Sequence, residues 1–288
     1  MNRNPTSHSY FSQRLRLHYL DWGNTTSPNM LLVHGSQDHC RTWDWFAEHF
    51  ADDFHIVAPD LRGHGDSEWV RGSSYHHVDY VYDLVQLVRQ QSLAPVVVVG
   101  HSMGGSLAAL FAGAYPELVS SLVLLEGVGL WPGLFEGQTP AERIRTWVDN
   151  TRALAGRQIR RYPTLEDAFA RMREANAHLD DEQARHLTIH GSNQNEDGSF
   201  SWKYDNYTHA YPAFRVPVEE TIELWKSIVC PTLIINARQG FAHRTGQDGT
   251  LEHFRHGQLV DVDEAGHWVH HDQLDAVVLA TRKFLTQT

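Results

Sequence analysis

The sequence predicts an α/β fold with a mostly parallel central sheet flanked by helices. Short apolar runs of strand length alternate with helical patterns from Leu17 to about Glu126, and the alternation resumes at Pro231. One such run leads through residues 100–104 directly into an Ala-rich helical pattern. Because strands joined by crossover helices lie parallel in one sheet, this alternation favours the α/β class over all-α or all-β folds.

Each predicted element has its own signal in the sequence. Residues 95–99 are a continuous β-branched run, which suits a strand buried on both faces. Residues 43–50 and 78–88 repeat apolar side chains at helical spacing. In chain order we expect strand 30–33, helix 43–50, strand 54–58, helix 78–88, strand 95–99, helix 102–115, strand 122–125, strand 232–235, helix 246–256, strand 258–262 and helix 270–285.

The alternation is interrupted by a long segment, residues 129–225, which is charged and largely helical. Helices are expected at 143–154 and 165–177, and a hairpin within 188–207 around the turn-forming sequence Glu196-Asp197-Gly198. The predicted organisation is therefore one domain, residues 1–128 and 226–288, with an insertion at 129–225.

Composition excludes several classes of protein. The 288 residues carry 35 acidic and 24 basic side chains, a net charge of −11, which argues against nucleic acid or an anionic membrane as partner. The 2 cysteines form no disulfide framework, and the 20 histidines are too scattered to predict a metal site. No apolar run reaches the length of a spanning helix and no secretory signal is evident, so a cytoplasmic protein without membrane insertion is expected.

The strongest chemical motif is Gly100-His101-Ser102-Met103-Gly104, which fits the pattern G-x-S-x-G. It lies between a predicted buried strand and a predicted helix, which is the context that the motif requires. A sharp turn there exposes the serine side chain, and the following helix N-terminus favours developing negative charge. We therefore predict Ser102 as a nucleophile.

A serine hydroxyl needs a base and an oxyanion site to act on a carbonyl carbon. His267 follows the strand predicted to end near Val262, which places it at the same carboxyl edge of the sheet as Ser102. Ser36, in His34-Gly35-Ser36, ends another strand at that edge. We expect His267 to be the base and the backbone N–H groups of Ser36 and Met103 to bind the oxyanion.

These landmarks together resemble the α/β-hydrolase superfamily. The shared segments are His34-Gly35-Ser36, residues 60–67 (DLRGHGDS), the elbow at 100–104 and Gly266-His267-Trp268, in the order typical of that family. The resemblance implies that residues 60–67 are structural and that the insertion at 129–225 is a helical cap, or lid, inserted after the sixth strand. Within the superfamily the chain is most similar to bacterial serine hydrolase-like proteins, whose substrates are often undefined.

The chain departs from the family pattern at the acid that would orient the base. The family usually places Asp shortly after the strand at 232–235, but here the sequence is Asn236-Ala237-Arg238-Gln239-Gly240. Glu126 ends the preceding buried strand, a position from which some relatives, including certain dehalogenases, take their acid. Because an unpaired buried carboxylate is costly, Glu126 needs a partner, and we predict it as the acid, with Asp248 as the alternative.

The expected function is that of a cofactor-free, metal-free serine hydrolase acting on a small-molecule carboxylic ester with an apolar acyl or alcohol part. Family members that cleave haloalkanes or epoxides use Asp at the elbow, so Ser102 favours acyl transfer to water. A carbon–carbon bond hydrolase, an amidase or a low-turnover ligand-binding protein remain alternatives. The cap aromatics able to line a pocket are Trp131, Phe135, Trp147, Trp202, Tyr204, Tyr207 and Phe214; the pocket residues predicted individually are His101, Trp131, Trp202, Tyr207 and Trp268.

Overall fold

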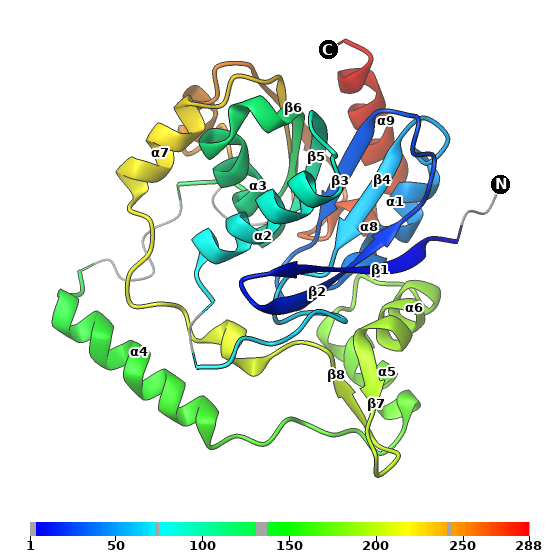
Figure 1. Cartoon of the computed structure of the whole chain (residues 1–288), viewed down its shortest axis with the longest axis vertical. Helices are drawn as coiled ribbons and strands as arrows, with labels where there is room; N and C mark the ends of the chain where they lie inside the picture. The colour runs from blue at the N-terminus through cyan, green and yellow to red at the C-terminus, as the bar shows by residue number, and fades with distance from the viewer. Residues whose placement is uncertain (1–3, 73–74, 131–136, 241–243, 288) are drawn as a thin grey trace.

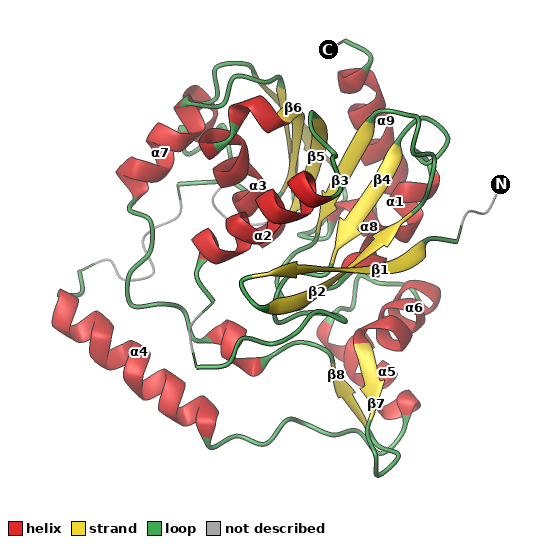
Figure 2. Ribbon diagram, viewed as in Figure 1, coloured by secondary structure: helices red, strands yellow, loops and turns green. Residues whose placement is uncertain are grey.

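One eight-stranded sheet forms the centre of the computed structural model (Figures 1 and 2), which describes residues 4–72, 75–130, 137–240 and 244–287. The strand order is β1-β2-β4-β3-β5-β6-β9-β10. The six strands from β4 to β10 are parallel, whereas the N-terminal hairpin β1–β2 joins them antiparallel. The predicted mostly parallel α/β sheet is therefore confirmed. The strands are β1 Thr6–Ser12, β2 Leu15–Asp21, β3 Asn29–Val33, β4 His55–Pro59, β5 Val96–His101, β6 Val119–Leu125, β9 Thr232–Ala237 and β10 Gly257–Val262.

Helices cover both faces of the sheet, and strand β5 shows why. Its valines alternate, so Val96 and Val98 join one hydrophobic cluster while Val97 and Val99 join the other. Helices α2 (His77–Gln90) and α3 (Met103–Ala114) pack on the first face, and α1 (Asp44–Glu48) and α9 (Leu274–Leu285) on the second (Figure 2). Both faces of the central strands are therefore covered by apolar side chains, and the backbone N–H and C=O groups of these strands are hydrogen-bonded within the sheet.

The inserted segment forms helices and one hairpin beside the carboxyl edge of the sheet (Figure 1). Helices α4 (Pro140–Ala155), α5 (Leu165–Ala175) and α6 (Asp181–Gly191) each begin with a capping box, which satisfies their first amide groups. Strands β7 (Ser192–Gln194) and β8 (Phe200–Trp202) form the hairpin. Its turn contains Gly198 with φ of +84°. No residue of α4 is buried, and this helix stands apart from the sheet.

The last helix of the insertion, α7 (Val218–Lys226), lies against the core instead. Gly113 of α3 is so close to α7 that a Cβ there would lie 2.3 Å from the backbone oxygen of Leu224. Trp225 joins the cluster that contains α2 and α3. The division into a core and a cap at 129–225 remains a proposal, and α7 packs with the core half of that division.

Two predicted helices differ from the observed ones. The helix expected at 246–256 is only the short 3-10 helix η4 (Thr250–His253), because Gly246 and Gly249 adopt φ of +85° and +86°, outside the α-helical region. The helix expected at 270–285 is broken at Gln273, with φ of −138°, into α8 (Val269–Asp272) and α9. No helix in the described ranges is long and apolar enough to cross a membrane.

Candidate active site

Ser102 occupies a strained turn between β5 and α3. Its backbone has φ of 53° and ψ of −123°, a conformation that L-residues rarely adopt. The turn depends on glycine neighbours: a Cβ on Gly100 would lie 2.5 Å from the Gly104 oxygen, and one on Gly104 would lie 2.2 Å from the Val33 oxygen. The strand–turn–helix geometry predicted from the motif is therefore present, and it presents the Ser102 side chain at the carboxyl edge of the sheet.

His267 lies in the loop between β10 and α8, and its Nε2 is 2.8 Å from Ser102 Oγ. His101, at the end of β5, contacts this loop: its Nε2 lies 2.8 Å from the His267 carbonyl oxygen. Burial, together with the nearby His267 ring, lowers the pKa of His101 well below its ordinary value. His101 is therefore neutral and donates its Nε2–H to that carbonyl. The arrangement allows the Ser102 proton to pass to His267.

Glu126 lies on the other side of the His267 ring. Its Oε2 is 3.6 Å from His267 Nδ1, an ion-pair separation rather than a hydrogen-bond length. The other carboxylate oxygen, Oε1, accepts a hydrogen bond of 2.6 Å from the Ala237 amide, and the Glu126 amide donates to the Ile235 oxygen at 2.9 Å. Strand β9 therefore holds a buried carboxylate directly behind His267.

Asp248, the alternative acid, has other partners. Its Oδ2 accepts from the Leu130 amide at 2.8 Å, and its Oδ1 accepts from the Thr250 amide at 3.0 Å. Both carboxylate oxygens are thus engaged in fixing η4 and the start of the insertion. The structure brings Glu126, and not Asp248, to His267.

The two amides predicted to bind an oxyanion flank Ser102. Met103 is the first residue of α3, and Ser36 lines the same pocket as Ser102. Gly35 permits a close approach, because a Cβ there would lie 3.2 Å from the Ser102 Cβ. Within the described chain, neither the Ser36 nor the Met103 amide donates to another backbone group. Neither amide is therefore taken up by a backbone hydrogen bond of the described residues.

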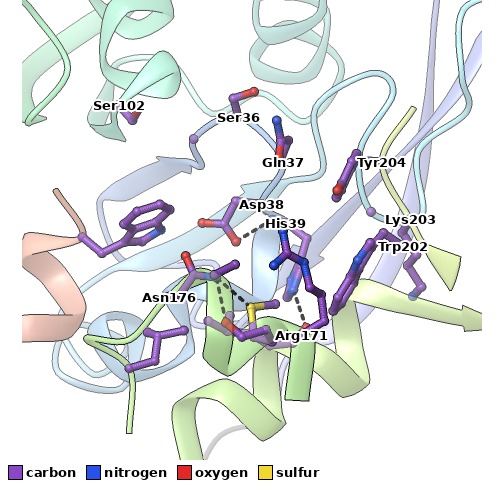
Figure 3. Close-up of a pocket in the computed structure, with 18 of the residues that line it drawn as sticks. Ser36, Gln37, Asp38, His39, Ser102, Arg171, Asn176, Trp202, Lys203 and Tyr204 are labelled. Carbon is purple, nitrogen blue, oxygen red and sulfur yellow. Dashed lines mark hydrogen bonds between the residues drawn. The ribbon is translucent and has the colours of Figure 1, made fainter. Parts of the chain in front are cut away.

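A cavity of about 520 Å³ opens onto Ser102 (Figure 3). Some of the residues predicted for the pocket line this cavity, and others do not. His101, Trp202 and Trp268 line this cavity, as does Tyr204. Tyr207 does not: it lines a second cavity nearer to α4. Trp131 lies outside the described residues, as does Phe135. Trp147 also lines the second cavity, and Phe214 is largely exposed beneath Arg143.

The cavity lining is less apolar than the aromatic content of the insertion suggested. Charged and amide side chains share the wall with the tryptophans: Gln37, Asp38, Arg160, Arg171, Asn176 and Lys203. Burial raises the pKa of Asp38. The expected substrate, an ester with an apolar acyl or alcohol part, would therefore meet a wall that is polar as well as aromatic. These residues have no periodic or motif signal in the sequence, because only the packing of the insertion on the core brings them together.

His18, Cys40 and Asp60 form a buried group of potential metal ligands in the described chain. The Asp60 carboxylate already accepts hydrogen bonds from His18 Nδ1 and from the Cys40 amide, both at 2.7 Å. Burial also raises the pKa of the Cys40 thiol well above its ordinary value, which disfavours the thiolate that binds metals. These contacts fit the structural role predicted for residues 60–67.

Comparison with known proteins identifies the family of the chain. The family model described as the alpha/beta hydrolase fold matches residues 28–274. A serine hydrolase-like protein from Danio rerio is 26% identical over 276 residues, covering 92% of this chain and 83% of that protein. The lipase LipV of Mycobacterium tuberculosis is 40% identical over 110 residues, covering 38% of this chain and 41% of that protein.

Among solved structures, a hypothetical protein from Pseudomonas aeruginosa superimposes with a TM-score of 0.87 at 24% identity. The match covers 97% of this chain and 99% of that chain, so the two proteins share one fold. The family match spans most of the sequence, including the elbow at Ser102 and the loop of His267. The chain therefore belongs to the α/β-hydrolase family.

Proposed function

We propose that the protein is a serine hydrolase that cleaves a carboxylic ester through an acyl-enzyme. The observation that carries this proposal is the contact of 2.8 Å between Ser102 Oγ and His267 Nε2 at the strained elbow. The similarity to a lipase and to a serine hydrolase-like protein supports the same class of reaction. Serine at the elbow, in place of the aspartate of epoxide-cleaving members, supports acyl transfer.

In the proposed first step Ser102 Oγ attacks the ester carbonyl carbon while His267 Nε2 takes the hydroxyl proton. The carbonyl π electrons move to the oxygen, which the Ser36 and Met103 amides stabilise. When the tetrahedral intermediate collapses, the bond to the alcohol oxygen breaks and His267 gives its proton to that oxygen. The alcohol leaves, and the acyl group remains on Ser102.

In the second step His267 takes a proton from water, and the hydroxide attacks the acyl carbon. The bond to Ser102 Oγ breaks and the serine recovers its proton from His267, so that one water yields one acid and one alcohol. Glu126 fixes the tautomer of the neutral imidazole and stabilises the imidazolium that forms in each step. Its buried position after β6, where its Oε1 accepts from the Ala237 amide of β9, keeps it behind the base rather than against the substrate.

The replacement Ser102→Ala tests the proposal. Its kcat for p-nitrophenyl esters should fall by about 10⁶-fold, since the residues of such a site act as a unit. The thermal unfolding midpoint should stay close to wild type, because only a hydroxyl at the pocket surface is lost. Retention of more than a few per cent of the activity would place the nucleophile elsewhere.

A further inference from the structure

We propose that the preferred ester carries a carboxylate away from the scissile bond, and that Arg160 and Arg171 bind this carboxylate. The inference rests on the proposed hydrolase function and names its substrate class. The cavity that contains Ser102 has a positively charged lining. In a chain of net charge −11, the described lining of this cavity contains three cationic side chains, Arg160, Arg171 and Lys203, against one acid, Asp38.

The two arginines line the same cavity as Tyr204. Burial raises the pKa of Tyr204, and the positive charges of Arg171 and Arg160 lower it. Figure 3 shows Arg171 and Tyr204 on the side of the pocket away from Ser102. A substrate that is held at Ser102 by its carbonyl group can therefore extend toward these cations.

The three cationic side chains differ in the ion pairs that they form within the protein. Lys203 Nζ pairs with Asp66 at 2.8 Å, and Arg171 uses one terminal nitrogen for Glu174 at 2.7 Å. Arg160 has no carboxylate within ion-pair distance among the described residues, and its guanidinium lies 5.0 Å from the centre of the Tyr162 ring. The arginines therefore retain donors that an anionic ligand could accept.

Asp38 is the acidic side chain in the described cavity lining, and its surroundings disfavour its negative charge. Burial raises the pKa of Asp38, and its Oδ1 already accepts a hydrogen bond of 2.8 Å from the His39 amide. Guanidinium groups bind carboxylates with paired, charge-assisted hydrogen bonds. Trp202 and Trp268 provide apolar walls in the same cavity for the carbon chain that links the ester to the carboxylate.

Matched esters that differ only in the distal group test this inference. The first pair is p-nitrophenyl hexanoate and mono-p-nitrophenyl adipate, which place a methyl group or a carboxylate at the end of the acyl chain. The second pair, propyl butyrate and the butyrate ester of 3-hydroxypropanoate, makes the same comparison on the alcohol side. Wild-type protein should show a higher kcat/KM for the carboxylate member of at least one pair. In the Arg160→Gln/Arg171→Gln double variant this preference should fall about tenfold or more, as loss of a hydrogen bond to a charged group implies.

The neutral esters serve as the internal control, and their kcat/KM should fall much less than that of the carboxylate esters, because an uncharged chain forms no ion pair with the two guanidinium groups. Arg161→Gln is the matched variant. This arginine follows Arg160 in sequence, pairs with Asp197 at 2.7 Å and lies outside the cavity lining, so the preference should persist. An unchanged preference in the double variant, or no preference in wild type for either pair, would overturn the inference.

A binding measurement tests the carboxylate site independently of the proposed hydrolytic activity. Calorimetry on Ser102→Ala protein with the four esters requires no turnover. Tighter binding of a carboxylate ester, lost on Arg160→Gln/Arg171→Gln replacement, supports the carboxylate site even if the wild type hydrolyses none of these esters. Equal binding of the neutral and anionic members would count against the site, whatever the hydrolytic activity.

Discussion

At the residue scale, two side chains that meet at His267 both stand on left-handed backbone at the end of a parallel strand. Ser102 follows β5 with φ of 53°, and Glu126 follows β6 with φ of 50°. A conformation with positive φ is costly for a residue other than glycine. Two such residues on neighbouring strands, facing the same imidazole, indicate a backbone shaped by the requirements of this site.

Replacement of Glu126 by Gln tests the role of the acid. Glutamine keeps the size of the side chain but offers no negative charge to the imidazolium and can favour the wrong tautomer of His267. We expect kcat to fall by about 10²–10⁴-fold, by analogy with the equivalent change in a serine protease. KM should change less, because Glu126 lies behind His267. Steady-state kinetics on an ester substrate gives both values.

Asp248→Asn is the control for this variant. Its carboxylate serves the Leu130 and Thr250 amides, so kcat should stay within about threefold and the effect should be on stability, roughly 1 kcal/mol as for a lost cap. A nearly normal Glu126→Gln variant beside an inactive Asp248→Asn variant would reverse the assignment of the acid.

Some residues of the site could be predicted from the sequence because a strand end fixes where they lie. Ser102 and Glu126 directly follow buried strands, His267 lies in the loop after β10, and parallel strands bring their carboxyl ends to one edge. Arg160 and Arg171 could not be predicted in this way. Their position at the pocket depends on how the insertion packs on the core, which no local pattern encodes.

At the element scale, the backbone at and just after the end of β9 fixes the position of the Glu126 carboxylate. Gly240 lies just beyond β9, and a Cβ there would lie 2.2 Å from Glu126 Oε2. We expect Gly240→Ala to displace the carboxylate from His267 and to lower kcat in the same direction as Glu126→Gln, although Glu126 is still present. Kinetics and thermal unfolding should be measured together, because overpacking also costs about 1–3 kcal/mol of stability.

Gly156→Ala provides the matched control, since nothing lies within 4 Å of a Cβ at that position. This variant should keep wild-type kcat. A Gly240→Ala protein with unchanged kcat would show that Glu126 can move without effect on the base, contrary to its proposed role.

Elements with a strong hydrophobic pattern could be predicted, whereas those shaped by single backbone conformations could not. The central strands followed from their apolar runs. The N-terminal hairpin β1–β2 was not expected, because β1 is mostly exposed and its sequence is polar. Left-handed Gly246 and Gly249 stop the helix predicted around them, although their type alone does not say which conformation they adopt.

At the scale of the whole molecule, buried neutral histidines link stability to pH. Burial lowers the pKa of His34 and His271 to about 3 and that of His64 to about 4, from the ordinary value of 6.5. The contacts of His34 require the neutral form: its Nε2 lies 3.0 Å from the Leu61 amide and accepts that hydrogen bond. Below pH 6.5 the unfolded chain therefore binds protons that the folded chain does not.

The free energy of unfolding should accordingly be level above pH 6.5 and fall as the pH decreases from there toward these lowered pKa values. At pH 5 the expected loss is about 2 kcal/mol for each of the three histidines, before carboxylates with ordinary pKa values titrate. Urea unfolding at pH 7.5 and pH 5.0 measures this difference. Equal midpoints at the two values would mean that these rings are charged or solvated in the folded protein.

The proposed reaction depends on one activated serine, and covalent labelling examines that most directly. Purified protein is treated with a fluorophosphonate, and the adduct is located by intact mass and peptide mapping. We predict a single phosphonyl group on Ser102, no labelling of Ser102→Ala, and much slower labelling when His267 is replaced by Gln. An unlabelled wild-type protein, or an adduct on another residue, would contradict a Ser102 nucleophile activated by His267.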